Sequence, residues 1–114
     1  MADLTEMLKA LADDSRLKMV VLLLKWDYCV GALARKLDLT ESAVSQHLKV
    51  LRMAGLVTGE KRGYYTHYQV DRNLLMALAE QLKTLASSRS EISHCQKSSF
   101  SNQNCCKKER KKNE

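Results

Sequence analysis

Apolar residues recur at helical spacing in the first part of the chain. A helix is predicted over residues 4–12, because its apolar side chains fall on one face. These side chains are Leu4, Met7, Leu8 and Leu11. Asp13 follows as a predicted N-cap for a second helix, and Asp14 suits the first turn of that helix. The pattern therefore predicts two consecutive helices with a capped turn between them.

The second predicted helix contains the apolar run MVVLLL. Its apolar positions at helical spacing are Leu17, Val20, Val21 and Leu24. Because apolar residues cover most sides of this helix, we expect it to be central and almost fully buried. The next five residues, KWDYC over 25–29, interrupt the pattern and favour either a loop or the start of another helix.

Residues 30–55 predict a helix-turn-helix. Leu33 and Leu37 lie four positions apart in the first helix, and residues 38–40 form a short interruption. Thr40 is a good N-cap for the second helix. The apolar positions of that helix are Val44, Leu48 and Leu51. Gly55 is placed to end the helix as a C′ glycine, so the two helices are short and joined by a tight turn.

The period of the pattern changes after Gly55. Residues 56–70 are rich in β-branched and aromatic side chains and form two runs on either side of EKRG, residues 60–63. Gly63 can adopt the positive φ of a hairpin turn, which would place Lys61 and Arg62 at the tip. A two-stranded ribbon directly after a helix-turn-helix is typical of a winged-helix fold.

A last long helix is predicted from Asp71 to about residue 90. Its apolar residues are Leu74, Leu75, Leu78, Leu82 and Leu85. The final segment, residues 95–114, has few apolar residues, and we expect it to be a flexible tail. The prediction is a mainly α domain with a small β-hairpin over residues 1–94, followed by a basic, cysteine-containing tail over 95–114.

The net charge of +6 is concentrated in the tail, which has six basic and two acidic residues. Such a tail suits a polyanionic partner such as nucleic acid, and it equally suits solubility, so both interpretations stay open. No apolar run is long enough to cross a bilayer, and no secretory signal begins the chain, so we expect a cytoplasmic protein. The chain lacks a catalytic triad pattern and a phosphate-binding glycine loop, which argues against an enzyme.

The outer face of the second helix in the pair carries side chains that can hydrogen-bond to base edges or phosphates. The predicted tip of the wing adds two basic residues, which suit phosphates or a narrow minor groove. The predicted DNA-binding residues are Ser42, Ser45, Gln46, His47, Lys49, Lys61 and Arg62. A basic hairpin after a helix-turn-helix favours this interpretation over an ordinary solvated surface.

Three segments resemble the ArsR/SmtB family of metal-responsive repressors. They are LKALADDSRLKMVVLLL, VGALARKLDLTESAVSQHLKVLRMAGLV and KRGYYTHYQV, and the resemblance spans roughly residues 4–90. It implies a winged-helix homodimer that binds an inverted repeat in double-stranded operator DNA and represses an operon until an inducer binds. It also implies that the first and last long helices pair across the dimer. The interface residues would then be Leu4, Leu8, Leu11, Leu75, Leu78 and Leu82.

Two sensing sites known in the resembling family are incomplete or absent here. One is a Cys-x-Cys pair before the recognition helix, for which this chain has Cys29 followed by Gly31. The other is a zinc site of Asp and His residues on the last long helix, which has no histidine before His94. One thiolate cannot hold a soft ion alone, so Cys29 would have to recruit ligands from elsewhere.

The tail supplies the remaining thiols, Cys95, Cys105 and Cys106. Trivalent arsenic and antimony prefer three thiolates, and some members of the resembling family carry their arsenite cysteines as a C-terminal cluster. Nearby basic side chains would favour thiolate formation. We therefore expect a repressor that releases its operator when As(III) or Sb(III) binds these three cysteines, with no other cofactor required.

Three alternatives remain open for the cysteines. Cys29 could join tail cysteines in one metal site, within or between subunits. Cys29 and the tail, or the tail alone, could form a disulfide in a redox or reactive-sulfur sensor of the same fold. The tail cysteines could also be incidental, with Cys29 acting as a small, half-buried apolar residue.

Overall fold

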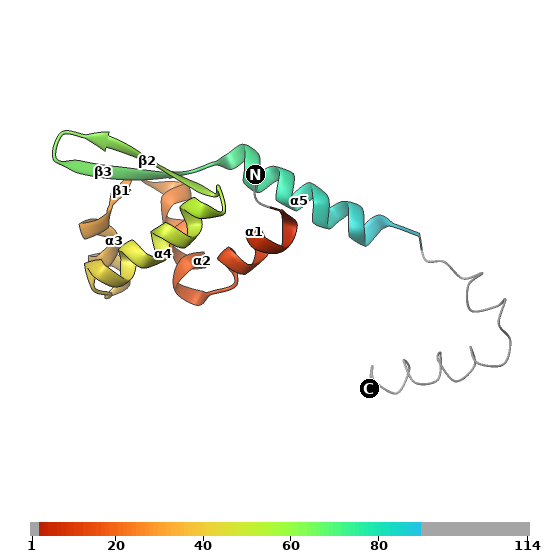
Figure 1. Cartoon of the computed structure of the whole chain (residues 1–114), viewed down its shortest axis with the longest axis horizontal. Helices are drawn as coiled ribbons and strands as arrows, with labels where there is room; N and C mark the ends of the chain where they lie inside the picture. The colour runs from red at the N-terminus through yellow and green to blue at the C-terminus, as the bar shows by residue number, and fades with distance from the viewer. Residues whose placement is uncertain (1–2, 90–114) are drawn as a thin grey trace, which may run out of the picture. The chain divides into compact units, whose positions relative to one another are not determined.

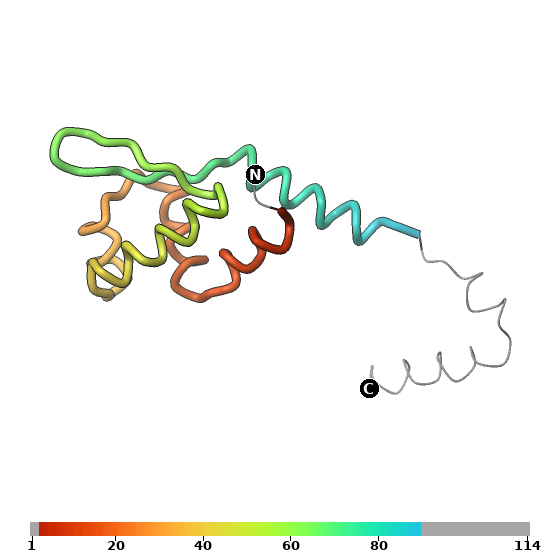
Figure 2. Tube along the Cα trace, in the orientation of Figure 1, coloured from red at the N-terminus to blue at the C-terminus, as the bar shows by residue number. Residues whose placement is uncertain are grey.

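The computed structural model describes residues 3–89 of the 114-residue chain. The chain divides into two units, residues 1–83 and 84–114, and the following account concerns the first of them. The elements, in chain order, are α1 (Leu4–Leu11), α2 (Asp14–Lys25), β1 (Tyr28–Cys29), α3 (Val30–Leu37), α4 (Glu41–Met53), β2 (Val57–Arg62), β3 (Tyr65–Val70) and α5 (Arg72–Ser87). Figure 1 labels them, and Figure 2 follows the same path as a Cα trace. The predicted helices and hairpin are confirmed.

Short polar side chains start several of the helices. Asp13 accepts a hydrogen bond from the backbone N–H of Arg16 at 3.0 Å, and Thr40 Oγ1 accepts one from Ala43 at the same distance. Each acceptor satisfies an N–H that has no partner inside its own helix. Both predicted N-caps are therefore confirmed. Asp71 caps α5 in the same way, through the N–H of Leu74 at 3.0 Å.

Gly55 ends α4 with φ of +82°. Its N–H donates to the carbonyl of Arg52 at 2.9 Å, and the next N–H, of Leu56, donates to Leu51 at 3.0 Å. These two bonds form a Schellman motif, and Leu51 and Leu56 are both buried next to it. The predicted C′ role of Gly55 is confirmed. Helix α4 therefore has a fixed end, from which the hairpin of β2 and β3 begins.

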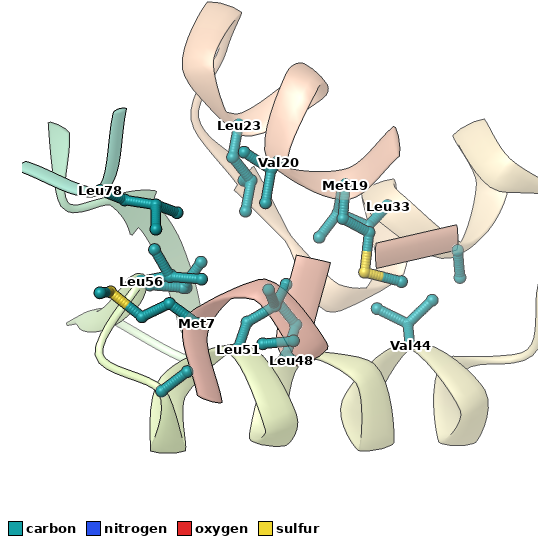
Figure 3. Close-up of a cluster of buried hydrophobic side chains, with 14 residues drawn as sticks. Met7, Met19, Val20, Leu23, Leu33, Val44, Leu48, Leu51, Leu56 and Leu78 are labelled. Atoms are coloured by element: carbon teal, nitrogen blue, oxygen red, sulfur yellow. The ribbon is translucent and has the colours of Figure 1, made fainter. Parts of the chain in front are cut away.

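One apolar core joins all five helices and the start of the hairpin (Figure 3). Its largest fully buried side chains are Met7, Met19, Leu33, Leu48, Leu51, Leu56, Val44 and Val57. The expectation that α2 is almost fully buried is wrong for the single chain. Leu17 and Val21 are 50% and 45% exposed, whereas Met19, Val20 and Leu23 face the core. An almost continuous apolar run fits several helical faces equally well, so its periodicity does not identify the buried one.

The last helix contributes to this core as well. Leu78 is only 3% exposed and belongs to the buried cluster, so its expected place in a dimer interface is wrong. Leu4, Leu11 and Leu75 are partly buried against the same cluster. Leu8 and Leu82 are 37% and 42% exposed, so of the expected interface residues these two remain the most open for a partner.

The sheet has three antiparallel strands in the order β1-β3-β2. The sequence did not predict β1, which pairs Tyr28 with Tyr68 and Cys29 with His67. The predicted turn at residues 60–63 is also wrong in its position. β2 continues to Arg62, which pairs with Tyr65, so Gly63 and Tyr64 form the two-residue turn. Gly63 has φ of +64° and Tyr64 does not have a positive φ, as in a type II′ turn.

Within residues 3–89, no helix is long and apolar enough to cross a membrane.

Candidate nucleic-acid interface

Helix α4 separates its buried and polar residues onto opposite sides. Val44, Leu48 and Leu51 are buried and hold the helix on the core. The spacing i, i+3, i+4 and i+7 brings a second set of residues together on the outer side. These exposed residues are Ser42, Ser45, Gln46 and Lys49. Four of the predicted DNA-binding residues therefore share one open helix face, which carries hydroxyl, amide and ammonium groups.

His47 lies differently from these four residues. Its side chain is only 24% exposed, and its Nδ1 lies 3.3 Å from a guanidinium nitrogen of Arg16 on α2. One oxygen of the Asp13 carboxylate lies 3.9 Å from His47 Nδ1. On an α-helix each residue is turned about 100° from the one before it, so His47 lies on the flank of α4 next to Gln46. The flank with His47 faces the turn between α1 and α2.

Arg16 connects three helices at this point. Its Nε donates to the carbonyl of Ala10 at 2.6 Å, and one Nη donates to the carbonyl of Lys9 at 3.4 Å. Its backbone N–H donates to Asp13, which lowers the pKa of that carboxyl below its ordinary value. Sequence reasoning missed Arg16, because its partner His47 is 31 positions away and no local pattern marks such a pair.

The wing exposes most of its distal residues. Tyr64 in the turn is 98% exposed and Tyr65 is 63% exposed, while Lys61 is exposed and has no ion-pair partner within residues 3–89. Sequence reasoning did not single out Tyr64, since only its place directly after Gly63 indicates a turn position. The end of the wing therefore offers one unpaired ammonium and two aromatic side chains.

Arg62 is held within the protein. Its guanidinium donates to Glu60 at 2.8 Å and to Asp27, and these carboxylates raise the pKa of Arg62 further above its ordinary value. Asp27 lies in the segment between α2 and β1, so this contact links the wing to the base of the sheet. The positive charge of Arg62 is therefore balanced locally, unlike that of Lys61.

Cys29 is the one cysteine among the described residues, and its thiol is free. It is half-buried and ends β1 immediately before α3. It also lines a groove of about 540 Å³ together with Arg35, Glu41 and residues 64–68. His67 is opposite Cys29 in the sheet, and His67 Nδ1 is buried without a hydrogen-bond partner in this part of the chain.

Residues 3–89 contain no group of three or more His, Cys, Asp or Glu side chains that could hold a metal ion. Cys95, Cys105 and Cys106 lie outside the described residues. At Gly31 an added Cβ would meet Glu41 Oε2 at 3.5 Å and an Arg35 nitrogen at 3.7 Å, which are ordinary contacts. The second position of a Cys-x-Cys pair thus has room for a side chain, although this chain has a glycine there.

Residues 13–58 match the protein family described as "Bacterial regulatory protein, arsR family". The transcriptional activator HlyU of Vibrio cholerae is 38% identical over 79 residues, which are 69% of this chain and 73% of that protein. The arsenical resistance operon repressor of Escherichia coli K12 is 36% identical over 70 residues, or 60% of each chain.

Solved structures show the same likeness. An ArsR-like transcriptional regulator from Rhodococcus sp. RHA1 matches with a TM-score of 0.69 and 27% identity, over 74% of this chain and 79% of that one. The structure described as reduced HlyU from Vibrio cholerae matches with a TM-score of 0.60 and 36% identity, over 74% and 88% of the two chains.

Proposed function

The chain belongs to the ArsR family of bacterial regulatory proteins, and from this premise we propose that it is an operator-binding repressor that responds to a soft metalloid. As a member of this family it is a DNA-binding transcription regulator and not an enzyme. The observation that carries the operator-binding part of the proposal is the exposed polar face of α4, followed directly by the wing. A regulator of this kind would act in the cytoplasm.

The proposed DNA-bound form is a homodimer on an inverted repeat. Each α4 would lie in the major groove of one half-site, where Ser45 and Gln46 can hydrogen-bond to base edges. Lys49 and Lys61 would contact phosphates. Exposed apolar residues on α1 and α5, with Leu8 and Leu82 among them, support pairing of these helices between subunits. Two-fold symmetry would then set the spacing between the recognition helices.

The proposed inducer is As(III) or Sb(III), bound by the thiolates of Cys95, Cys105 and Cys106. Three thiolates are the donor set that soft trivalent ions prefer, and the Escherichia coli relative is named for arsenical resistance. The described residues by themselves do not offer three such donors. Binding would lower operator affinity through a coupling free energy of about 1–3 kcal/mol, or roughly 5- to 150-fold.

An operator titration with cysteine variants tests this proposal. Fluorescence anisotropy would follow a labelled duplex from the promoter of the chain's own gene, with arsenite, antimonite, cadmium or zinc added to the bound complex. We expect release by arsenite in the unchanged protein and in Cys29→Ser. We expect no release in Cys95→Ser, Cys105→Ser or Cys106→Ser, although each should still bind the duplex. Release from a chain truncated before Cys95 would contradict the tail site.

Cys29 supports a second candidate function, a thiol-based redox or reactive-sulfur sensor. Its free thiol lines an open groove, and a relative with the same fold has been described in a reduced form. Two thiols would lose two electrons and two protons to a peroxide and form one disulfide, while the peroxide is reduced to water. The disulfide would join Cys29 to a tail cysteine, or two tail cysteines to each other.

The same titration separates the two candidates when hydrogen peroxide replaces the metalloid. Release by peroxide, reversed by dithiothreitol and absent in Cys29→Ser, would support the redox function involving Cys29. The expected mass of the released protein is two hydrogens lower for each disulfide. Release by arsenite under reducing conditions, with no response to peroxide, would instead support the metalloid function.

A further inference from the structure

We propose that Arg16 is a positioning residue that fixes the tautomer of His47, so that His47 Nε2–H is offered to a DNA phosphate. The inference rests on the proposed DNA-binding function and adds to it a contact on the flank of α4. Sequence reasoning placed His47 among the residues that can hydrogen-bond to base edges or phosphates, but it did not say which imidazole nitrogen would donate. The geometry of Arg16 indicates which one, because it determines which imidazole nitrogen carries the proton.

Arg16 is itself held in place by the protein backbone. Its Nε and one Nη donate to the carbonyls of Ala10 and Lys9, which belong to the last turn of α1. The backbone N–H of Arg16 donates to the side chain of Asp13, which is the N-cap of α2. Since these contacts come from two helices, the remaining Nη1 has a defined direction, and it lies 3.3 Å from His47 Nδ1.

The chemistry of this contact assigns the proton. A guanidinium is always charged and has only donors, so an imidazole nitrogen that hydrogen-bonds to it must be the acceptor. Nδ1 of His47 therefore carries no proton, and the neutral ring carries its proton on Nε2. Protonation of Nδ1 would remove this hydrogen bond and place two positive groups together. The groups around the ring are the Arg16 guanidinium from α2 and the Asp13 carboxylate from the turn before α2.

Nε2 of His47 is free to meet a ligand. It has no hydrogen-bond partner among the described residues, and in that part of the chain only His67 Nδ1 is both buried and unpartnered. Because the His47 side chain is 24% exposed and its Nε2 is not among the fully buried unpartnered atoms, Nε2 keeps some contact with solvent. His47 directly follows Gln46, so its flank adjoins the exposed polar face of α4, and such a flank meets the phosphate backbone when a helix lies in the major groove. A neutral N–H donor can form one hydrogen bond to a phosphate oxygen there.

A double-mutant cycle on DNA affinity tests the proposal. Arg16→Lys keeps the charge, but its single nitrogen cannot occupy the three positions from which Nε, Nη1 and Nη2 reach the two carbonyls and the imidazole. We expect Arg16→Lys and His47→Ala each to weaken binding about 5-fold, as for loss of one hydrogen bond. The double variant should bind no more weakly than His47→Ala alone, because Arg16 acts through His47. His47→Gln, which can accept at Oε1 and donate at Nε2, should keep affinity within about 2-fold.

The nature of the contact follows from two further measurements on the same variants. A phosphate contact predicts equal weakening on operator and random duplexes, and a neutral donor predicts an unchanged salt slope. Weakening on the operator alone would overturn the phosphate assignment. Additive effects of Arg16→Lys and His47→Ala would overturn the role of Arg16. Urea unfolding of each variant checks that all of them are folded at the titration temperature.

Imidazole NMR gives a readout that does not need DNA. Long-range ¹H–¹⁵N spectra at slightly alkaline pH should show the Nε2–H tautomer for His47 in the unchanged protein and a mixture in Arg16→Lys. An Nδ1–H tautomer in the unchanged protein would overturn the inference. The correct tautomer in a protein that binds no promoter duplex would instead identify the proposed function as the part that fails.

Discussion

Asp13 gives stability that depends on pH. The N–H of Arg16, and then the positive charge of Arg16, lower its pKa in the folded protein. A lowered carboxyl pKa contributes stability above the ordinary value near 3.9, and this stability is lost as the pH falls through the lower, folded value. We expect Asp13→Asn to unfold at lower urea than the unchanged protein at neutral pH, and the difference to shrink at an acid pH below the ordinary carboxyl pKa.

Urea titrations followed by circular dichroism at both pH values measure this difference. Asn is also a good N-cap, so the variant keeps the helix start and changes mainly the charge. If the urea midpoints of the unchanged protein and Asp13→Asn differed by the same amount at both pH values, the difference would not come from the charge of Asp13.

Gly31 is the position where one substitution should create a new soft-ion site. The space around it accepts a Cβ, and its φ is not in the left-handed region, so Gly31→Cys should fold normally. The full chain with Cys95, Cys105 and Cys106 changed to Ser provides the background. In that background, Gly31→Cys should bind cadmium through Cys29 and the new thiolate, seen as ultraviolet cadmium–thiolate absorption.

The matched control is the same background with Gly31 retained, which should show no such absorption because one thiolate remains. Gly31→Ser tests the substitution without the sulfur. Equal absorption in all three proteins would mean that the second thiol contributes nothing at this position.

At the scale of single residues, the sequence predicted local interactions well and distant ones poorly. The caps Asp13 and Thr40 bond to N–H groups three positions ahead, so their spacing is visible in the sequence. The contact of Arg16 with His47 depends on how α2 and α4 pack. The three tail cysteines lie outside the described residues, so their role stays a prediction from thiolate chemistry.

At the scale of elements, two glycines with positive φ form a matched pair. An added Cβ at Gly55 would lie 3.2 Å from Leu74 Cδ2, whereas one at Gly63 would meet nothing within 4 Å. Gly63→Ala should therefore cost only the left-handed backbone energy, about 1–2 kcal/mol. Gly55→Ala should cost more, because the close contact with Leu74 is added. Urea unfolding of both variants measures the difference, and equal losses would contradict it.

The wing contains a second matched pair, Lys61 and Arg62. Lys61→Ala should weaken DNA binding on all sequences and reduce the salt slope by about 1, as for loss of one phosphate contact. Arg62→Ala should change the slope less, because Glu60 and Asp27 already balance that charge. Anisotropy titrations over a range of salt concentrations measure both slopes. A larger effect from Arg62→Ala would show that Arg62 leaves its carboxylates to bind DNA.

Elements with a strong hydrophobic periodicity were predicted from the sequence, and an element too short to show periodicity was not. Helices α3 and α4 were predicted because their apolar residues fit only one face. Strand β1 has two residues, which is too short to show alternation, and it exists because Tyr28 and Cys29 find partners in β3. The turn of the wing was displaced because Gly63 permits a positive φ without fixing which residues lie beside it.

At the scale of the whole molecule, the proposed dimer depends on apolar residues that the single chain leaves open. Leu82→Glu on α5 adds a charge at a position that is 42% exposed, so it should leave the folding of the subunit intact. Sedimentation should show a monomer, and operator affinity should fall because one half-site remains per protein. Leu78→Glu is the contrasting variant, because its buried position predicts unfolding.

The outcome separates the two kinds of apolar residue on α5. A dimer that persists in Leu82→Glu, with unchanged operator affinity, would exclude this part of α5 from the interface. A variant that unfolds would show that Leu82 contributes to the core instead.

The short strand β1 has a mechanical consequence for the wing. It pairs with β3 only at His67 and Tyr68, so these two residues have neighbours on both sides, while Tyr65 and Thr66 are joined to β2 alone. Beyond His67 and Tyr68 the backbone of β3 is hydrogen-bonded to β2 alone, and the Arg62–Asp27 ion pair is a side-chain connection back to the base of the sheet. Bending at Thr66 would break fewer backbone hydrogen bonds than bending at His67 or Tyr68, so on the proposed operator Lys61 and Tyr64 could adapt to the width of the groove while the pairing of Cys29 with His67 is kept.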